Sequence, residues 1–196
     1  MKAFLGSCVG VVVRRRRLFV LLNQLFFWVV LVVALLMAFL SVPPPFYGEK
    51  FEGLPYFLFG DNWVLMILGI FVFNLVFSAF LIVTLPGLAF PLFSLAFLLY
   101  RAVVWGGLLA FASTSQFVVA LPTLILEAEA YVLAAMSGTV LGLSWLKPER
   151  IYGSEGLSRR EALGVAFKEA FHVYVLIAAI LFFAAIVETI TLLSVT

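Results

Sequence analysis

Long runs of apolar residues dominate the chain, and they alternate with short polar segments. The runs lie at residues 18–42, 62–85, 87–112, 116–146 and 167–193. A helix needs about 20 apolar residues to cross the roughly 30 Å hydrocarbon core, whereas a barrel strand has only about 9–11 residues of alternating polarity. The pattern therefore predicts an all-α fold, a polytopic bundle of five membrane-spanning helices, with residues 18–196 as a single transmembrane domain.

The composition supports this prediction and excludes several classes of protein. Hydrophobic residues make up 65% of the chain and charged residues 11%, against roughly 45–50% and about 25% in soluble domains. The single cysteine, Cys8, leaves no partner for an intramolecular disulfide. The formal net charge of +2 gives no indication of a nucleic-acid partner. A lipid bilayer is the expected surrounding, and we predict a multi-pass protein of the cell (plasma) membrane.

Basic residues gather on one predicted side of that membrane. They are Lys2 and Arg14–Arg17 before the first run, and Lys147, Arg150, Arg159, Arg160 and Lys168 after the fourth. Because Lys and Arg are enriched in cytoplasmic segments, the N-terminus is predicted to be cytoplasmic and the C-terminus outside. Residues 1–17 form a basic N-terminal arm, whose apolar part is too short to span and is expected at the interface or in the cytoplasm.

The last predicted helix is longer than a bilayer requires. Ser158 and Glu161 have the spacing of a capping box. In this motif the side chain of each of the two residues accepts a hydrogen bond from the backbone N–H of the other. A helix that begins near Arg159 and continues for about 35 residues measures roughly 52 Å. Its first turns are therefore expected to extend beyond the membrane, before the apolar run begins.

Several polar side chains lie inside the predicted spans. An ionisable group at the centre of a span costs on the order of 2.5–3.5 kcal/mol on insertion, so each is expected to find a partner. Arg101, Glu127 and Glu188 are predicted to meet in the same half of the membrane, and Asn74 lies in the second run. For Arg101 we favour an internal pair that fixes the order of the helices. For Glu127 a solute or proton site is an equal alternative.

The fourth run contains a proline and a stripe of small residues. Pro122 is expected to break the helix just before Glu127, because proline removes one hydrogen bond of the helix. Broken helices beside buried carboxylates occur in transporter sites, although a simple kink is also common. The small residues, one helical turn apart, predict a packing face for the third or fifth run or for another subunit. They are Ala130, Ala134, Gly138 and Gly142.

No recognised catalytic or cofactor motif is present in the sequence. Glu127 and Glu129 do not form the Glu-Glu-x-x-x-Arg pattern of intramembrane CAAX-type proteases, and the chain has one histidine, His172. No nucleophile elbow, phosphate loop or Cys/His cluster is found. We therefore expect no catalytic, cofactor or metal site, and a non-enzymatic protein.

The order of these features resembles the stage II sporulation protein M family. The matching residues are Leu121-Pro122, Glu127, Ala134-Ala135 and Gly138, followed by Ala184-Ala185-Ile186-Val187-Glu188-Thr189 near the end of the chain. They fit that family's "LPHG-x-x-E-x-x-A…AG…G" and closing "A-x-x-E" patterns, over about residues 60–193. Thr123-Leu124 replaces the family's His-Gly, and Arg101 stands where asparagine is common.

The resemblance implies a multi-span, non-enzymatic protein that works with partners. Sporulating members of the family belong to a membrane complex with cell-wall-degrading enzymes and are thought to scaffold it. We therefore expect a scaffold or subunit of a membrane complex, formed with other membrane proteins or as a homo-oligomer. The alternative is a small transporter or channel that uses Glu127, Glu188 and Arg101.

Overall fold

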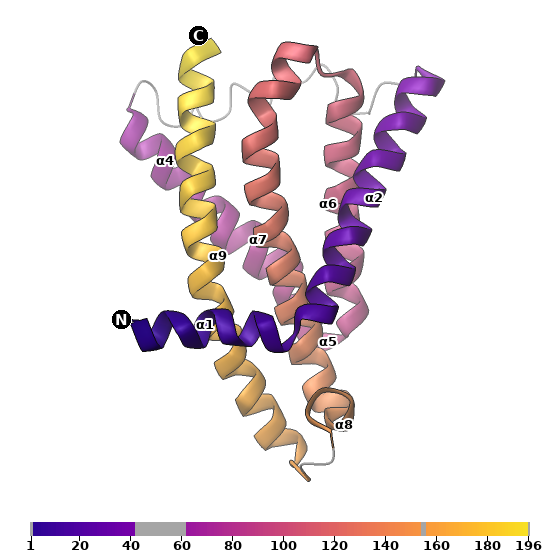
Figure 1. Cartoon of the computed structure of the whole chain (residues 1–196), viewed down its shortest axis with the longest axis vertical. Coiled ribbons are helices and arrows are strands. Elements are labelled where there is room, and N and C mark those ends of the chain that lie inside the picture. The colour runs from indigo at the N-terminus through magenta and orange to yellow at the C-terminus, as the bar shows by residue number, and fades with distance from the viewer. Residues whose placement is uncertain (1, 42–61, 154–155, 196) are drawn as a thin grey trace.

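A computed structural model describes residues 2–41, 62–153 and 156–195, and within these ranges the chain is helical without a strand. The elements are α1 (Lys2–Arg14), α2 (Arg16–Leu40), α4 (Trp63–Val72), the π-helix η1 (Phe73–Thr84), α5 (Leu85–Ala89), α6 (Pro91–Phe111), α7 (Thr114–Leu146), α8 (Pro148–Tyr152) and α9 (Arg159–Val195). Figure 1 shows them as one elongated bundle, with α1 lying across it.

Five helical stretches are long and apolar enough to cross a membrane. They are Arg16–Leu40, Trp63–Ala89, Pro91–Phe111, Gln116–Leu146 and Arg159–Leu193. The predicted all-α bundle with five spans is thus confirmed. Figure 1 places α1 and the C-terminal end of α9 at different levels of the bundle, with the C-terminus at one extreme end. Which side of the membrane each terminus occupies stays a prediction.

The second span differs from the prediction in two ways. Its central part is the π-helix η1, and the helix then continues as α5 through Pro86 and Gly87 instead of ending near residue 85. The chain reverses only at Phe90, whose backbone is extended (φ −152°, ψ 124°), and Pro91 opens α6. Pro86 lies just after the change from π-helix to α-helix, and a proline costs a helix only one backbone hydrogen bond, a loss that helices inside membranes tolerate. Pro86 therefore does not end the helix.

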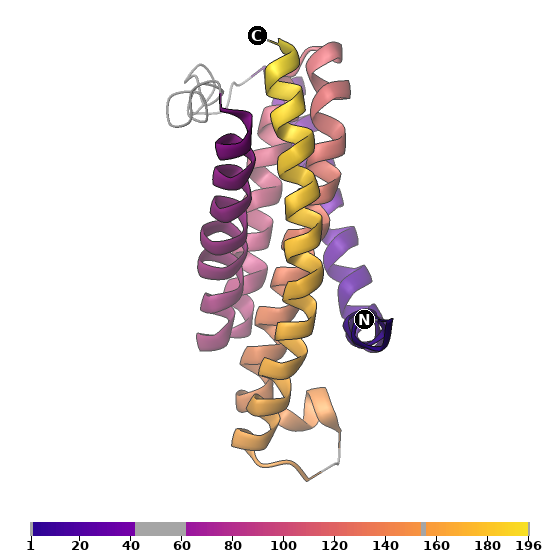
Figure 2. The ribbon, with the colours of Figure 1, turned by 90° about the vertical axis from the view of Figure 1, so that its left-hand side faces the viewer.

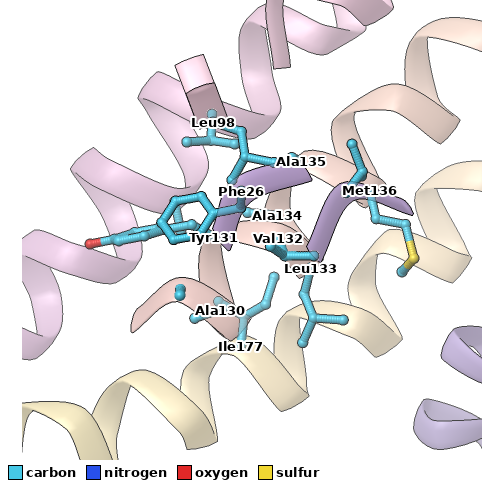
Figure 3. Close-up of a cluster of buried hydrophobic side chains, with 14 of the residues drawn as sticks. Phe26, Leu98, Ala130, Tyr131, Val132, Leu133, Ala134, Ala135, Met136 and Ile177 are labelled. Carbon is cyan, nitrogen blue, oxygen red and sulfur yellow. The ribbon is translucent and has the colours of Figure 1, made fainter. Parts of the chain in front are cut away.

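Helix α7 forms the centre of the bundle. Its side chains from Ala130 to Gly138 are all buried, and its most extensive contact is with α9. Figure 3 shows this segment surrounded by Phe26 of α2, Leu98 of α6 and Ile177 of α9. Because lipid tails are as apolar as these side chains, close packing rather than exclusion of water holds such helices together.

The expected break at Pro122 is absent from the structure. Helix α7 is continuous from Thr114 to Leu146 with Pro122 inside it, so that prediction was wrong. Proline removes a single hydrogen bond, and helices inside membranes tolerate this loss where neighbouring groups satisfy the freed carbonyl. The first turn of α7 is further stabilised by a capping box between Ser113 and Gln116.

The small-residue stripe of α7 packs against another part of the same chain. A Cβ atom built at Gly138 would overlap Ser94 Oγ and lie 2.8 Å from the carbonyl oxygen of Thr84. At Gly142 it would overlap the carbonyl oxygen of Gly87. The stripe thus meets α5 and the start of α6, which belongs to the third run, one of the predicted partners. Gly106, in the middle of α6, instead approaches the backbone of α2.

The N-terminal arm is attached to α9 by two ion pairs. Arg14 and Arg15 each donate to one carboxylate oxygen of Glu169, at 3.1 and 3.0 Å. The Glu169 side chain is only 8% exposed and that of Arg15 12%, whereas that of Arg14 is 66% exposed. Charge-assisted hydrogen bonds of this kind are about twice as strong as neutral ones. We call Arg14, Arg15 and Glu169 the arm clamp.

Arg15 also connects the arm to α8. Its Nη1 donates to the carbonyl oxygen of Ile151 at 2.8 Å, and its guanidinium lies 5.1 Å from the ring centre of Tyr152. Burial and then the negative charge of Glu169 raise the pKa of Tyr152 to about 12, so this phenol stays neutral at ordinary pH. The clamp therefore joins α1, α8 and α9, and on α1 the side chain of Cys8 is fully buried.

The long last helix is confirmed. Helix α9 begins at Arg159 and has 37 residues. Ser158 N–H donates to Glu161 Oε2 at 2.9 Å, and Glu161 N–H donates back to Ser158 Oγ at 3.4 Å, as the capping-box prediction requires. In Figures 1 and 2 the end of α7, the short α8 and the start of α9 extend past α1 and the other spans. We call this part the extension.

Cys8 provides a probe for the arm clamp. In Glu169→Gln, one neutral amide replaces the carboxylate that holds both arginines, and charge-assisted hydrogen bonds are worth about 1.5–3 kcal/mol each. We expect maleimide labelling of Cys8 to become about 10- to 100-fold faster. Glu149→Gln, an exposed carboxylate of α8, is the matched control. Equal labelling rates in the two variants would show that the clamp does not hold the arm.

The close helix contact at Gly142 predicts that an added side chain there lowers the stability of the fold. In Gly142→Ala the new methyl group must displace the backbone of Gly87, so we expect a loss of stability of about 1–3 kcal/mol. Gly164→Ala in α9 has nothing within 4 Å of the added group and should instead gain up to about 1 kcal/mol of helix propensity. Thermal unfolding of both variants in mild detergent tests this. Unchanged stability of Gly142→Ala would contradict the close contact.

Candidate functional site: a chain of intramembrane polar residues

Asn74 and Glu127 meet between the second and fourth spans. The Nδ2 atom of Asn74, on η1, donates to Glu127 Oε1, on α7, at 2.7 Å. Both residues are nearly inaccessible, with exposures of 8% and 6%. Without water to bind them, polar groups at this depth require protein partners. This hydrogen bond therefore connects two helices at a fixed register.

Tyr131 extends the contact to the third span. One turn after Glu127 on α7, its hydroxyl donates to Asn74 Oδ1 at 3.0 Å and accepts from Arg101 Nη2 at 3.2 Å. The Arg101 guanidinium also lies 4.6 Å from the centre of the Tyr131 ring. In Figure 3 the Tyr131 hydroxyl points out of the buried apolar cluster, while its ring packs within it. Arg101, Tyr131, Asn74 and Glu127 form a continuous chain, which we call the polar chain.

Glu188 of α9 lies beside the polar chain but is not hydrogen-bonded to it. Glu127 is within electrostatic range of both Glu188 and Arg101. The Oε2 atom of Glu188 is buried and has no hydrogen-bond partner among the described residues. The structure thus brings together all four predicted polar residues, three of them through hydrogen bonds.

A second polar contact separates the two glutamates of the fourth span. Asn23 of α2 donates to Glu129 Oε1 at 2.7 Å, so Glu127 and Glu129 face different helices. Sequence reasoning missed Asn23 and Tyr131 as partners. For Tyr131 a signal was present, because a residue four positions after Glu127 lies on the same helix face. For Asn23 only the fold supplies the proximity, since it is 106 positions away from Glu129.

The chemistry available to the polar chain is the exchange of protons and the stabilisation of charge. Among the described residues, no three His, Cys, Asp or Glu side chains gather as a metal site would require. His172 lies elsewhere, with its Nδ1 atom 2.7 Å from the carbonyl oxygen of Lys168 and its ring near Phe4. Arg101, the positively charged member of the polar chain, faces the ring and the hydroxyl of Tyr131. These contacts offset the cost of removing its guanidinium from water.

Comparison with protein families identifies the chain. The family model for stage II sporulation protein M matches residues 24–191, and the chain therefore belongs to this family. The match includes every member of the polar chain, Glu188 and the small-residue stripe. Comparisons with curated proteins and with solved structures give no significant match.

The hydroxyl of Tyr131 should contribute measurably to stability. Tyr131→Phe removes two hydrogen bonds, each worth on the order of 0.6 kcal/mol between helices in a membrane. We expect a total loss of about 1–2 kcal/mol, including the cost of an unpaired Asn74 oxygen. Reversible unfolding in mixed detergent measures it, with Tyr100→Phe, at an exposed position of α6, as the control.

A double variant tests whether the hydrogen bond itself is responsible. Once Asn74 is replaced by Ala, the Tyr131→Phe change should cost less than it does alone, because the two side chains are coupled through one contact. Strictly additive losses would contradict the role of the polar chain as a connection between helices.

Proposed function

We propose that this protein is a non-enzymatic scaffold or subunit of a membrane complex, placed in the cell (plasma) membrane. The observation that supports it best is the internal pairing of the polar chain. Asn74 and Tyr131 each bind two other members, and Arg101 binds Tyr131. The side chains that a solute pathway would present to its solute are engaged in holding three helices together.

The extension supports the same proposal. It is a helical part that reaches past the other spans (Figure 2), and it carries charges of both signs on exposed side chains. Those residues are Lys147, Glu149, Arg150, Arg159, Arg160 and Glu161. A mixed-charge surface outside the hydrocarbon is suited to a polar contact with a partner protein, whereas the apolar sides of the bundle are suited to lipid.

Gentle affinity purification of the full chain from its native membranes tests the proposal. Mass spectrometry and particle-mass determination should find a stoichiometric second protein. Lys147→Gln/Arg150→Gln, on the extension, should reduce its recovery, because exposed interface charges contribute to association. Arg16→Gln/Arg17→Gln, an equal change of charge on α2, is the matched control. Recovery of a homo-oligomer alone would contradict a scaffold for other proteins and would favour the second candidate below.

A transporter or channel is the second candidate, and one observation favours it. The unpartnered, buried oxygen of Glu188 lies on the α9 side of Glu127. Such a group is unusual inside a membrane and typical of proton or solute pathways. In this case proteoliposomes should show flux that Glu127→Gln abolishes without lowering expression. Unchanged flux in this variant would remove Glu127 from the site.

A further inference from the structure

The run of four arginines divides into two pairs with different surroundings. Arg14 and Arg15 belong to the arm clamp, and both bind Glu169. Arg16 and Arg17 are exposed, and no carboxylate of the described residues forms an ion pair with either of them. Two adjacent guanidinium groups without a counter-charge repel each other and favour an anion close by.

The two free arginines begin an amphiphilic stripe along α2. A shallow hollow in the surface is lined by Arg16, Arg17, Val20, Leu21 and Gln24. These positions follow one another at intervals of about one turn, so they lie on one helix face. The same face continues with the exposed side chains of Trp28, Leu31 and Leu35. Positive charge thus stands at one end of a surface that is otherwise apolar.

The orientation of α1 sets the depth of this charged end. Helix α1 lies across the bundle next to the start of α2 (Figure 1), and it exposes the apolar side chains of Phe4, Val9 and Val13. A helix that lies across the spans and exposes apolar side chains is suited to the plane of the membrane interface. With α1 at that level, Arg16 and Arg17, which follow it directly, would reach the lipid phosphates.

We propose that this stripe is a binding site for one anionic phospholipid. The phosphodiester accepts hydrogen bonds from Arg16 and Arg17, and the acyl chains lie along Val20, Leu21 and Trp28. A single leaflet is roughly 15 Å deep, which corresponds to about 10 residues of helix. The apolar part of the stripe below the arginines has the required length. The site is independent of the proposed scaffold function, since it uses neither the extension nor the polar chain.

Native mass spectrometry of the full chain in mild detergent tests the site. The protein is mixed with equal amounts of dioleoylphosphatidylglycerol and dioleoylphosphatidylcholine, which differ in net charge but share the phosphodiester. The wild type should bind the anionic lipid in preference. Arg16→Gln/Arg17→Gln should reduce this preference by about 30-fold, and each single variant by about 5-fold. The control Lys147→Gln/Arg150→Gln removes the same charge from the extension and should leave the preference unchanged.

Three outcomes would overturn the proposal. An equal loss of preference in the two double variants would mean that overall charge, not the stripe, attracts the lipid. Displacement of the lipid by millimolar inorganic phosphate would mean that the arginines bind a free anion. A wild type without preference would mean that no anionic lipid is selected. If the double variant does not fold, as judged by its elution in size-exclusion chromatography, the single variants decide between these results and the proposal.

Discussion

A polar side chain inside hydrocarbon must find its partner within the protein, and this constraint organises the bundle around α7. Helix α7 carries Glu127, Glu129 and Tyr131 within five positions, and their partners come from η1, α2 and α6. Each of these contacts permits only one register of the helices it joins, because a shift by one residue would leave a carboxylate or an amide unpaired. Apolar packing alone would specify that register less strictly.

The π-helix in the second span serves the same constraint. Three of its buried residues, Asn74, Ala79 and Thr84, recur every five positions, and the other two, Ser78 and Val83, each precede one of these directly. In an α-helix this spacing would turn successive side chains by about 140° from one another, whereas a π-helix bonds at an interval of five. The three residues can thus face α7 together: Asn74 binds Glu127, and Thr84 donates to the carbonyl oxygen of Ala134 at 2.9 Å. Long π-helices are rare, and this one coincides with the polar contacts.

Sequence reasoning predicted what hydrophobic length determines and missed what depends on contacts between distant segments. The five spans, the start of the last helix and the proximity of Arg101, Glu127 and Glu188 follow from run lengths and depth, whereas the hydrogen bond of Asn74 to Glu127 does not. The expected break at Pro122 was wrong, and the second span continues to Ala89 instead of ending at residue 85. Local rules omit the neighbouring helices, which allow a membrane helix to continue past proline. Glu169 could not be assigned to the arm, because it is separated from Arg15 by 154 positions.

The arginine run illustrates how a small change of direction gives identical residues different roles. Helix α1 ends at Arg14 and α2 begins at Arg16, so the bend at Arg15 turns the first pair toward Glu169 and leaves the second pair exposed. The positive-inside pattern treats all four residues as equivalent. In the folded protein we expect replacement of the first pair to loosen the arm and replacement of the second pair to change only an exposed surface of α2. Half of the basic run that predicts topology is therefore also engaged in a folding contact, and the two contributions are separable because only Arg14 and Arg15 bind Glu169.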